Sequence, residues 1–190
     1  MELLDIVDEN GLPTGETVSR EEAHRLGIRH RTSHVWLIRR RFGRVQVLLQ
    51  KRSPKKDSYP GCYDISSAGH IKAGDGFLDS ALRELSEELG VVAEAGELIF
   101  CGLRRFRFRD TFYGRAFVDD QVSSVYALWR DLDADRFTVQ KSEVESVLWM
   151  DYDDCVAMVE TNSAPNCIFM QELDMISDAF GKQNDADSSF

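Results

Sequence analysis

Apolar and polar residues alternate over several short stretches of this 190-residue chain, and runs of this kind predict β-strands. Two short strands at about 3–8 and 15–18 flank an Asn10-Gly11 turn, which is the pattern of a β-hairpin. Longer strands are expected at about 33–39, 45–51, 63–68, 98–109, 121–130 and 146–150.

Helical stretches interrupt the strands at irregular intervals. Ser19 and Glu22 form a capping box that opens a short helix, and Gly27 ends it. The irregular alternation favours an α+β fold, in which helices cover both faces of a mixed β-sheet as an α/β/α sandwich. Two further helices are expected at about 152–161 and 167–179, the second with apolar residues at Ile168, Met175, Ile176 and Phe180.

The stretch 78–89 has a clear helical periodicity. An amphipathic helix of this kind buries its apolar side against the rest of the domain. At about 100° per residue, that side is formed by Leu78, Ala81, Leu82, Leu85 and Leu89.

The same helix carries a band of three carboxylates, Glu84, Glu87 and Glu88, which we expect to face away from the core. Arg83 lies one turn before Glu87, where an ion pair helps to hold the carboxylates in place. An acidic surface exposed to solvent is one explanation of such a band. Because like charges repel unless a cation lies among them, and Mg²⁺ prefers oxygen ligands, a divalent-metal site beside the Gly69 loop is the other.

Composition limits the range of functions. With 43% hydrophobic residues, the chain is long enough for one well-buried domain, which we place at 1–180. The polar stretch 181–190 is expected to be a disordered tail. A net charge of −10 argues against a nucleic-acid polymer as the main partner.

Cysteine use and hydropathy bear on the compartment. The four cysteines lack the spacing of a disulfide framework or a metal site, so free thiols in a reducing compartment are expected. The sequence has no apolar run of about 18 residues and no signal-like start, which predicts a cytoplasmic protein with no membrane partner.

The spacing around the acidic helix resembles the Nudix box, the motif of the Nudix hydrolase family. Gly69 is followed by Asp75 and then by the run Arg83-Glu84-Leu85-Ser86-Glu87-Glu88-Leu89-Gly90-Val91. The family normally has Glu at the position of Asp75, where the residue is mainly structural, so the difference leaves the metal ligands unchanged. The resemblance implies the Nudix α/β/α sandwich and attack of water on a nucleoside diphosphate linked to another group.

The resemblance also implies roles for single residues. Glu84 and Glu88 match the usual ligands of Mg²⁺ or Mn²⁺, and Glu87 matches an auxiliary ligand or a group that positions the base. Arg83 orients these acids. Clustered carboxylates raise one another's pKa, so one of them can serve as general base.

A basic cluster upstream of the box is a candidate phosphate site. Arg52, Lys55 and Lys56 can hold phosphate, Arg by bidentate pairing and Lys as a point charge, and a solvated basic turn is the alternative. His70, next to the loop glycine, is expected to contact substrate or metal.

From about residue 3 to residue 150 the chain also resembles the Nudix branch related to type I isopentenyl diphosphate isomerase. Such an isomerase shifts a double bond with a Cys before the Gly-His of the box and a Glu in a later strand. Ala68 and Gln121 stand at those positions here, which removes the acid–base pair and favours hydrolysis. A sensor domain that binds a diphosphate without cleaving it is a further alternative.

Histidines supply a second candidate metal site. His24 and His30 flank the first predicted helix and, with His70 and Asp119, can form an accessory site retained from the isomerase-like branch. Asp119 or Asp120 can also supply the extra carboxylate that many Nudix hydrolases have outside the box. Which of the two faces inward depends on strand register.

The segment 103–117 alternates aromatic and basic residues. Phe106 and Phe108 fall on one strand face, and Arg105, Arg107 and Arg109 on the other. A half-buried strand with a charged outer face, an aromatic wall beside the substrate and a dimer contact all fit, and monomer and homodimer stay open. The small-molecule substrate is open among nucleotide sugars, dinucleotides, coenzyme A derivatives, oxidised nucleotides and prenyl diphosphates.

Overall fold

The structure is a computed structural model that describes residues 2–181. Nearly all of the predicted disordered tail therefore lies outside the described residues, and the single domain at 1–180 stays a prediction. The N-terminal hairpin consists of β1 (Leu3–Val7) and β2 (Pro13–Ser19), followed by α1 (Arg20–Leu26). The Ser19 side chain caps α1 and Gly27 ends it in the left-handed conformation, as the sequence predicts.

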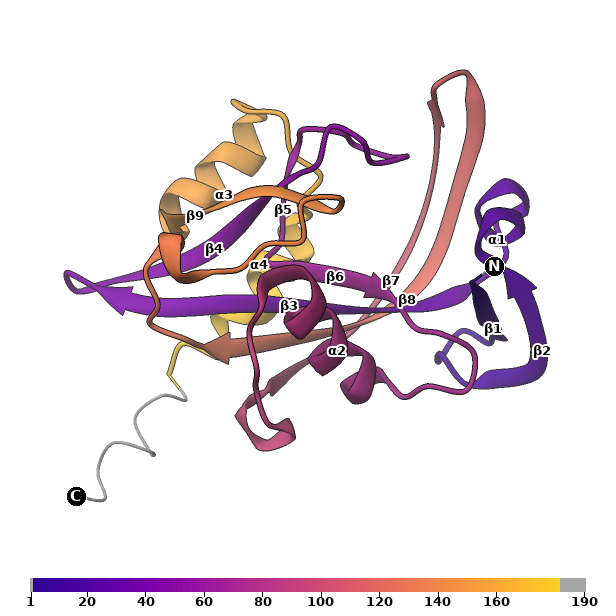
Figure 1. The fold of residues 1–190 in the computed structure, drawn as a ribbon, viewed down its shortest axis with the longest axis horizontal. Helices are drawn as coiled ribbons and strands as arrows, with labels where there is room; N and C mark the ends of the chain where they lie inside the picture. The colour runs from indigo at the N-terminus through magenta and orange to yellow at the C-terminus, as the bar shows by residue number, and fades with distance from the viewer. Residues whose placement is uncertain (1, 182–190) are drawn as a thin grey trace.

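One large mixed sheet forms the centre of the molecule (Figure 1). The strand order is β5-β4-β3-β8-β7, with β6 paired to β3 and β9 paired to β4. Strand β3 runs parallel to β8, whereas its pairs with β4 and β6 are antiparallel. These strands are β3 (His30–Arg41), β4 (Arg44–Arg52), β5 (Tyr63–Asp64), β6 (Ser67–His70), β7 (Ile99–Phe112), β8 (Arg115–Trp129) and β9 (Val144–Asp151).

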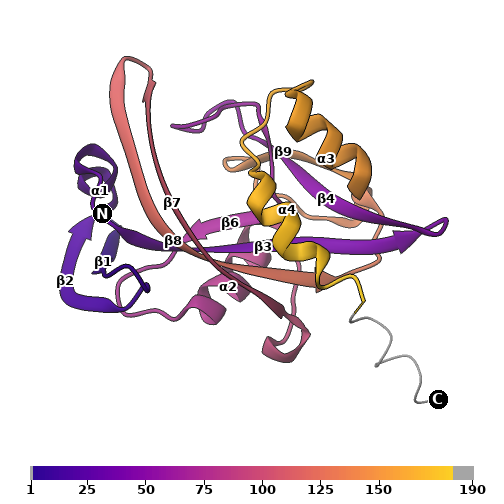
Figure 2. The same cartoon turned by 180° about the vertical axis from the view of Figure 1, so that it is seen from behind.

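Helices cover both faces of this sheet (Figures 1 and 2). Val35 and Leu37 of β3 pack in a core cluster with α2, while Trp36 and Ile38 point to the other face, toward α3 and α4. Because side chains alternate across a strand, the continuous apolar run in β3 serves two cores. The predicted α/β/α sandwich is confirmed, with α2 (Phe77–Leu89), α3 (Tyr152–Thr161), α4 (Met170–Ser177), and the short 3-10 helices η1 (Ala95–Glu97) and η2 (Ala134–Arg136).

Several predicted elements differ from the structure. Strands β3 and β8 begin at His30 and Arg115, earlier than the expected 33 and 121, and β7 ends at Phe112 rather than 109. The last helix begins at Met170 rather than 167, because Pro165 and Cys167 make backbone hydrogen bonds of 2.9 Å to Tyr63 of β5. The predicted strand 63–68 is divided into β5 and β6. Ser66 lies between them, where its hydroxyl donates to the Leu48 carbonyl at 2.6 Å.

Strands β7 and β8 continue past the rest of the sheet as a long two-stranded arm (Figure 1). The arm turns at Tyr113-Gly114, where both residues have positive φ. The tip of the arm contacts the loop between β4 and β5, where the Tyr113 hydroxyl donates to the Lys56 carbonyl at 3.3 Å. The arm therefore forms a wall rather than a free extension.

Candidate active site

Helix α2 packs its apolar side into the core, as its periodicity predicts, with Ala81, Leu85 and Leu89 fully buried. The expectation that all three carboxylates face away from the protein is wrong for Glu88. Only 4% of Glu88 is exposed, and its Oε2 accepts a hydrogen bond of 3.3 Å from the backbone N–H of Ala68. Strand β6 covers this side of the helix, which a helical wheel does not show.

Glycine at position 69 lets α2 approach β6 closely. A Cβ atom on Gly69 would lie 2.1 Å from Cδ of Glu84, so a larger residue here would displace this carboxylate. Arg83 lies 2.7 Å from Glu84 Oε1 and 3.3 Å from Glu87 Oε2, which confirms the expected i,i+4 pair. Its guanidinium also donates to the His70 carbonyl at 3.4 Å, so Arg83 ties the helix to β6.

Burial strongly changes the acidity of two of these groups. Burial, followed by the nearby charge of Glu84, raises the pKa of Glu88 to about 8. Burial also raises the pKa of Glu84, and the ion pair with Arg83 opposes that shift. A cation between the two carboxylates would offset both costs, and the donor set is entirely oxygen, as Mg²⁺ requires. The residues present therefore fit the ion that their pattern predicts.

The carboxylates line a polar cavity of about 200 Å³, which adjoins a much larger cavity of about 1220 Å³. Gly69, His70 and Lys56 line both, so the two spaces meet at the start of the Nudix-like loop. A diphosphate held at this junction would have one end at the acids and its attached group in the larger space.

The basic cluster is divided by the structure. Arg52 lines the larger cavity and lies 2.8 Å from Asp64, while Lys56 lines both cavities and pairs with Glu143. Lys55 is exposed and is absent from the described lining of either cavity, so the structure does not place it with the other two. Glu143 reaches the acids from the loop before β9, and no local pattern in the sequence marks it.

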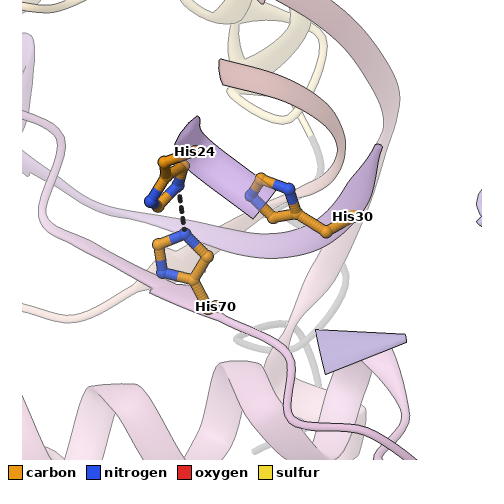
Figure 3. Close-up of side chains that lie close together, drawn as sticks. All are labelled: His24, His30 and His70. Atoms are coloured by element: carbon orange, nitrogen blue, oxygen red, sulfur yellow. Dashed lines mark hydrogen bonds between the residues drawn. The ribbon is translucent and has the colours of Figure 1, made fainter. Parts of the chain in front are cut away.

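Three histidine side chains that could together hold a metal ion lie close to one another (Figure 3). His24 of α1, His30 of β3 and His70 of β6 offer nitrogen atoms that all lie within 4.8 Å of one another. The His24 and His70 Nε2 atoms are 3.2 Å apart. Burial lowers the pKa of His24 to about 3 and that of His70 well below its usual value, so these rings are neutral at neutral pH.

Asp119 joins this histidine cluster. Its Oδ1 lies 3.5 Å from His30 Nε2 and 3.8 Å from His24 Nε2, and within residues 2–181 neither Oδ1 nor His30 Nε2 has a hydrogen-bond partner. His30 Nδ1 lies 2.9 Å from the Ile28 carbonyl, to which it donates, so Nε2 carries the lone pair. Three nitrogens and one carboxylate oxygen therefore converge, and His30 Nε2 and Asp119 Oδ1 are the two of these atoms that have no hydrogen-bond partner among the described residues.

Strand register selects Asp119 over Asp120. Asp120 points to the other face of β8, where it accepts from Arg29 at 2.8 Å and lies 3.6 Å from Arg107. Asp119 faces the larger cavity, but neither aspartate is among the described residues that line the smaller polar cavity. Their predicted role beside the expected metal ligands Glu84 and Glu88 is therefore not supported by this arrangement.

The two faces of β7 separate as their alternation predicts. Arg105, Arg107 and Arg109 are exposed, whereas Phe106 and Phe108 line the larger cavity. Further rings join this wall, which we call the aromatic wall and which consists of Tyr59, Phe106, Phe108, Phe112, Phe117 and Phe169.

The combination of this sandwich with an acidic helix behind a glycine loop is that of a Nudix protein. The NUDIX domain family model matches residues 28–169, and the chain belongs to the Nudix hydrolase family. It is 42% identical over 157 residues to Nudix hydrolase 3 of Arabidopsis thaliana, covering 80% of this chain and 20% of that protein. An uncharacterized Nudix hydrolase of Clostridium acetobutylicum is 33% identical over 159 residues, with 84% and 74% covered.

Solved structures share the fold. DR0079 from Deinococcus radiodurans has a TM-score of 0.66 at 20% identity, covering 93% of this chain and 98% of that one. The NUDIX domain of Shewanella oneidensis NrtR, solved with ADP ribose, has a TM-score of 0.59 at 17% identity, with 85% and 99% covered. Among residues 2–181, none of the helices combines the length and apolar character needed to cross a lipid bilayer.

Proposed function

We propose that this protein hydrolyses a diphosphate linkage in a nucleoside-diphosphate-type or related small molecule, with Mg²⁺ or Mn²⁺ bound by Glu84 and Glu88 and assisted by Glu87. The observation that carries the proposal is the pair of partly and fully buried carboxylates beside Gly69, at the junction of a polar and a larger cavity. A bound divalent ion would neutralise charge on the phosphoryl oxygens and acidify a bound water.

The chain's own residues bind and orient. Arg83 holds Glu84 and Glu87 in place by the ion pairs described above. Lys56 and Arg52 neutralise phosphate charge from the β4–β5 side, and His70 lies where the two cavities meet. Glu143, which pairs with Lys56, is a further carboxylate able to accept a proton near the acids.

We also propose that His24, His30, His70 and Asp119 hold an accessory divalent ion. The support is the convergence of three imidazoles near an Asp119 oxygen that has no hydrogen-bond partner within the described residues. The N–H of His30 that bonds to a backbone carbonyl is typical of metal-binding histidines. Nitrogen ligands favour a transition metal or zinc over Mg²⁺.

Isomerisation has less support than hydrolysis. Ala68 lines the larger cavity without an ionisable group, and the Gln121 amide donates to Asp119 and accepts from Thr32 at 2.8 Å. Neither side chain can transfer a proton as an acid. A sensor domain that binds a diphosphate without cleaving it would have the same acidic residues. Only a measurement of turnover distinguishes such a sensor from an enzyme.

The test is phosphate-product release from a panel of nucleotide sugars, dinucleotides, coenzyme A derivatives and prenyl diphosphates, with and without Mg²⁺. We expect metal-dependent cleavage of at least one class, with two phosphate-bearing products when the linkage lies inside the molecule. Saturable binding with no turnover of any compound would support the sensor instead.

A further inference from the structure

Arg104 of β7 is a buried cation with unused hydrogen-bond donors. Only 3% of the residue is exposed, and its Nε lies 2.8 Å from Glu172 Oε1 of α4 as an ion pair. Among residues 2–181, this buried Nε makes no hydrogen bond beyond the ion pair. A guanidinium carries five N–H donors, and leaving buried donors unpaired is costly, so an acceptor from outside the chain is the natural partner.

Arg104 lines the larger cavity together with Phe106 and Phe169. The guanidinium carbon lies 4.6 Å from the centre of each ring, and the two rings are 4.3 Å from each other. The two rings therefore lie next to each other beside the guanidinium. An edge of the guanidinium that the rings leave open would pair with two acceptors lying in one plane.

Charge balance favours a neutral ligand group at this position. Glu172 already neutralises Arg104, and it also accepts hydrogen bonds from His34 Nδ1 at 2.8 Å and Trp36 Nε1 at 3.0 Å. A second anion beside this carboxylate would be buried without a cation of its own, which is unfavourable. Arg104 is therefore suited to a pair of uncharged acceptors.

The aromatic wall favours a flat ligand. The rings of Phe106 and Phe108 stack at 5.4 Å with planes 26° apart, and Tyr59 continues the row at 5.7 Å from Phe108. A heteroaromatic base can stack along such a row while its edge reaches Arg104. Guanine presents two adjacent acceptors, O6 and N7. On the same edge of adenine, the N7 acceptor lies next to an amino group, which is a donor.

We propose that Arg104 recognises the base of the substrate and that this base is guanine, so that the larger cavity takes guanosine-diphosphate-linked compounds in preference to adenosine ones. This inference rests on the proposed hydrolysis of a diphosphate. The base lies against the aromatic wall, its O6 and N7 accept from Arg104, and the diphosphate extends to the acidic cavity.

The test compares kcat/KM and equilibrium binding for GDP-glucose, ADP-glucose and IDP-glucose. We expect GDP-glucose to be preferred over ADP-glucose by about tenfold or more, as for a bidentate arginine contact. IDP-glucose should match GDP-glucose, because hypoxanthine keeps O6 and N7. Equal values for the guanine and adenine compounds, or a preference for adenine, would overturn the proposal.

Variants separate recognition from folding. Arg104→Lys keeps the charge beside Glu172 but lacks the planar fork, so the preference for guanine should be lost, mainly through a lower kcat/KM for GDP-glucose. The double variant Arg104→Gln/Glu172→Gln removes both buried charges together, should melt cooperatively, and should also show no preference. Arg105→Gln, on the exposed face of the same strand, should leave the preference unchanged.

Two failures are distinguishable. If GDP binds tenfold more tightly than ADP in an Arg104-dependent way but no compound is cleaved, hydrolysis is overturned and base recognition is supported. If both nucleotide sugars are cleaved equally, or if Arg104→Lys retains the full preference, hydrolysis stands and base recognition is overturned.

Discussion

The side chain of Glu84 lies directly over the α-carbon of Gly69, so closely that a Cβ atom there would be 2.1 Å from the carboxyl carbon. Gly69 opens the Nudix box in this chain, and its φ is not positive. A left-handed backbone is therefore not the reason for a glycine at this position. Glycine is needed because a helix carboxylate occupies the space of a side chain. This contact holds one proposed metal ligand at the junction of the two cavities.

Gly69→Ala should therefore reduce kcat/KM by about 100-fold, the cost of misplacing a reacting group by about 1 Å. The Glu84 carboxylate can rotate away from the new methyl group, so the melting temperature should change little. Gly96→Ala is the matched control, because a Cβ there meets no atom within 4 Å and its φ is not positive. Equal activity of the two variants would show that Glu84 is not held by Gly69.

Glu88→Gln should abolish hydrolysis and stabilise the metal-free protein at alkaline pH. The pKa of Glu88 is raised from 4.5 to about 8 by burial, so the folded state binds more protons than the unfolded state between these values. The stabilisation that protonated Glu88 gives the folded state at low pH is thus lost as pH rises from 4.5 toward 8. In EDTA, the variant should melt at a higher temperature than wild type at pH 8 and at a similar one at pH 4.5.

This pairing of lost activity with gained stability is the expected behaviour of a buried catalytic acid. A variant that loses activity and is also less stable at pH 8 would indicate that Glu88 is structural.

Lys56 and Lys55 are neighbours with different surroundings, which makes them a matched pair. Lys56→Gln should raise KM about tenfold, or about 1.4 kcal/mol, because Lys56 lines both cavities and is the proposed partner of the substrate phosphate. Lys55→Gln should leave KM unchanged, since Lys55 is exposed and outside the described cavity linings. Steady-state kinetics on one cleaved substrate measure both KM values. Equal changes in KM for the two variants would refute the different roles of Lys56 and Lys55.

Zn²⁺ or Co²⁺ should bind at the histidine cluster and raise the melting temperature of wild type. At 100 times the dissociation constant the stabilisation is about 2.7 kcal/mol. His24→Gln should remove most of this shift, because one of the converging nitrogens is lost. Mg²⁺ provides the comparison, since the melting-temperature shift that it causes should persist in His24→Gln. If the absorption bands of bound Co²⁺ are unchanged in His24→Gln, the cobalt ion binds at another site.

Glu172→Gln should destabilise the fold at pH 7 by about 3–5 kcal/mol, because Arg104 then becomes an unpaired buried charge. The pKa of Glu172 is lowered from 4.5 to about 2, with hydrogen-bonded His34 and Arg104 overcoming the effect of burial. Its stabilisation is therefore complete above pH 4.5 and is lost as pH falls toward 2. The difference between variant and wild type in denaturant titrations should shrink over that range.

Glu160→Gln is the control for this experiment. Glu160 is exposed at the end of α3, so its replacement should change stability by less than about 0.5 kcal/mol. A Glu172→Gln protein as stable as Glu160→Gln at pH 7 would show that the buried pair contributes nothing.

Much of the fold follows from local patterns. The cap at Ser19, the apolar stripe of α2 and the span of α3 are set by neighbours in sequence, and the structure agrees with each of these predictions. The start of α4 was not predictable in this way. Its preceding residues are held extended by backbone bonds to Tyr63, a residue about 100 positions earlier.

The candidate site divides along the same line. The Nudix spacing places Glu84, Glu87 and Glu88 on one helix because helical geometry is local. The burial of Glu88 under β6, the exclusion of Lys55 and the choice of Asp119 over Asp120 depend on pairings that join distant parts of the chain.

The sequence by itself determined the family motif, the acidic helix and the layered α+β architecture, since each rests on residue spacing within one element. Only the tertiary structure decided which charges are buried and which groups converge. Histidines from α1, β3 and β6 meet only once the sheet is formed, and Arg104 meets Glu172 only when α4 packs on β7. The energy of a buried charge depends on such contacts, and they are properties of the folded chain.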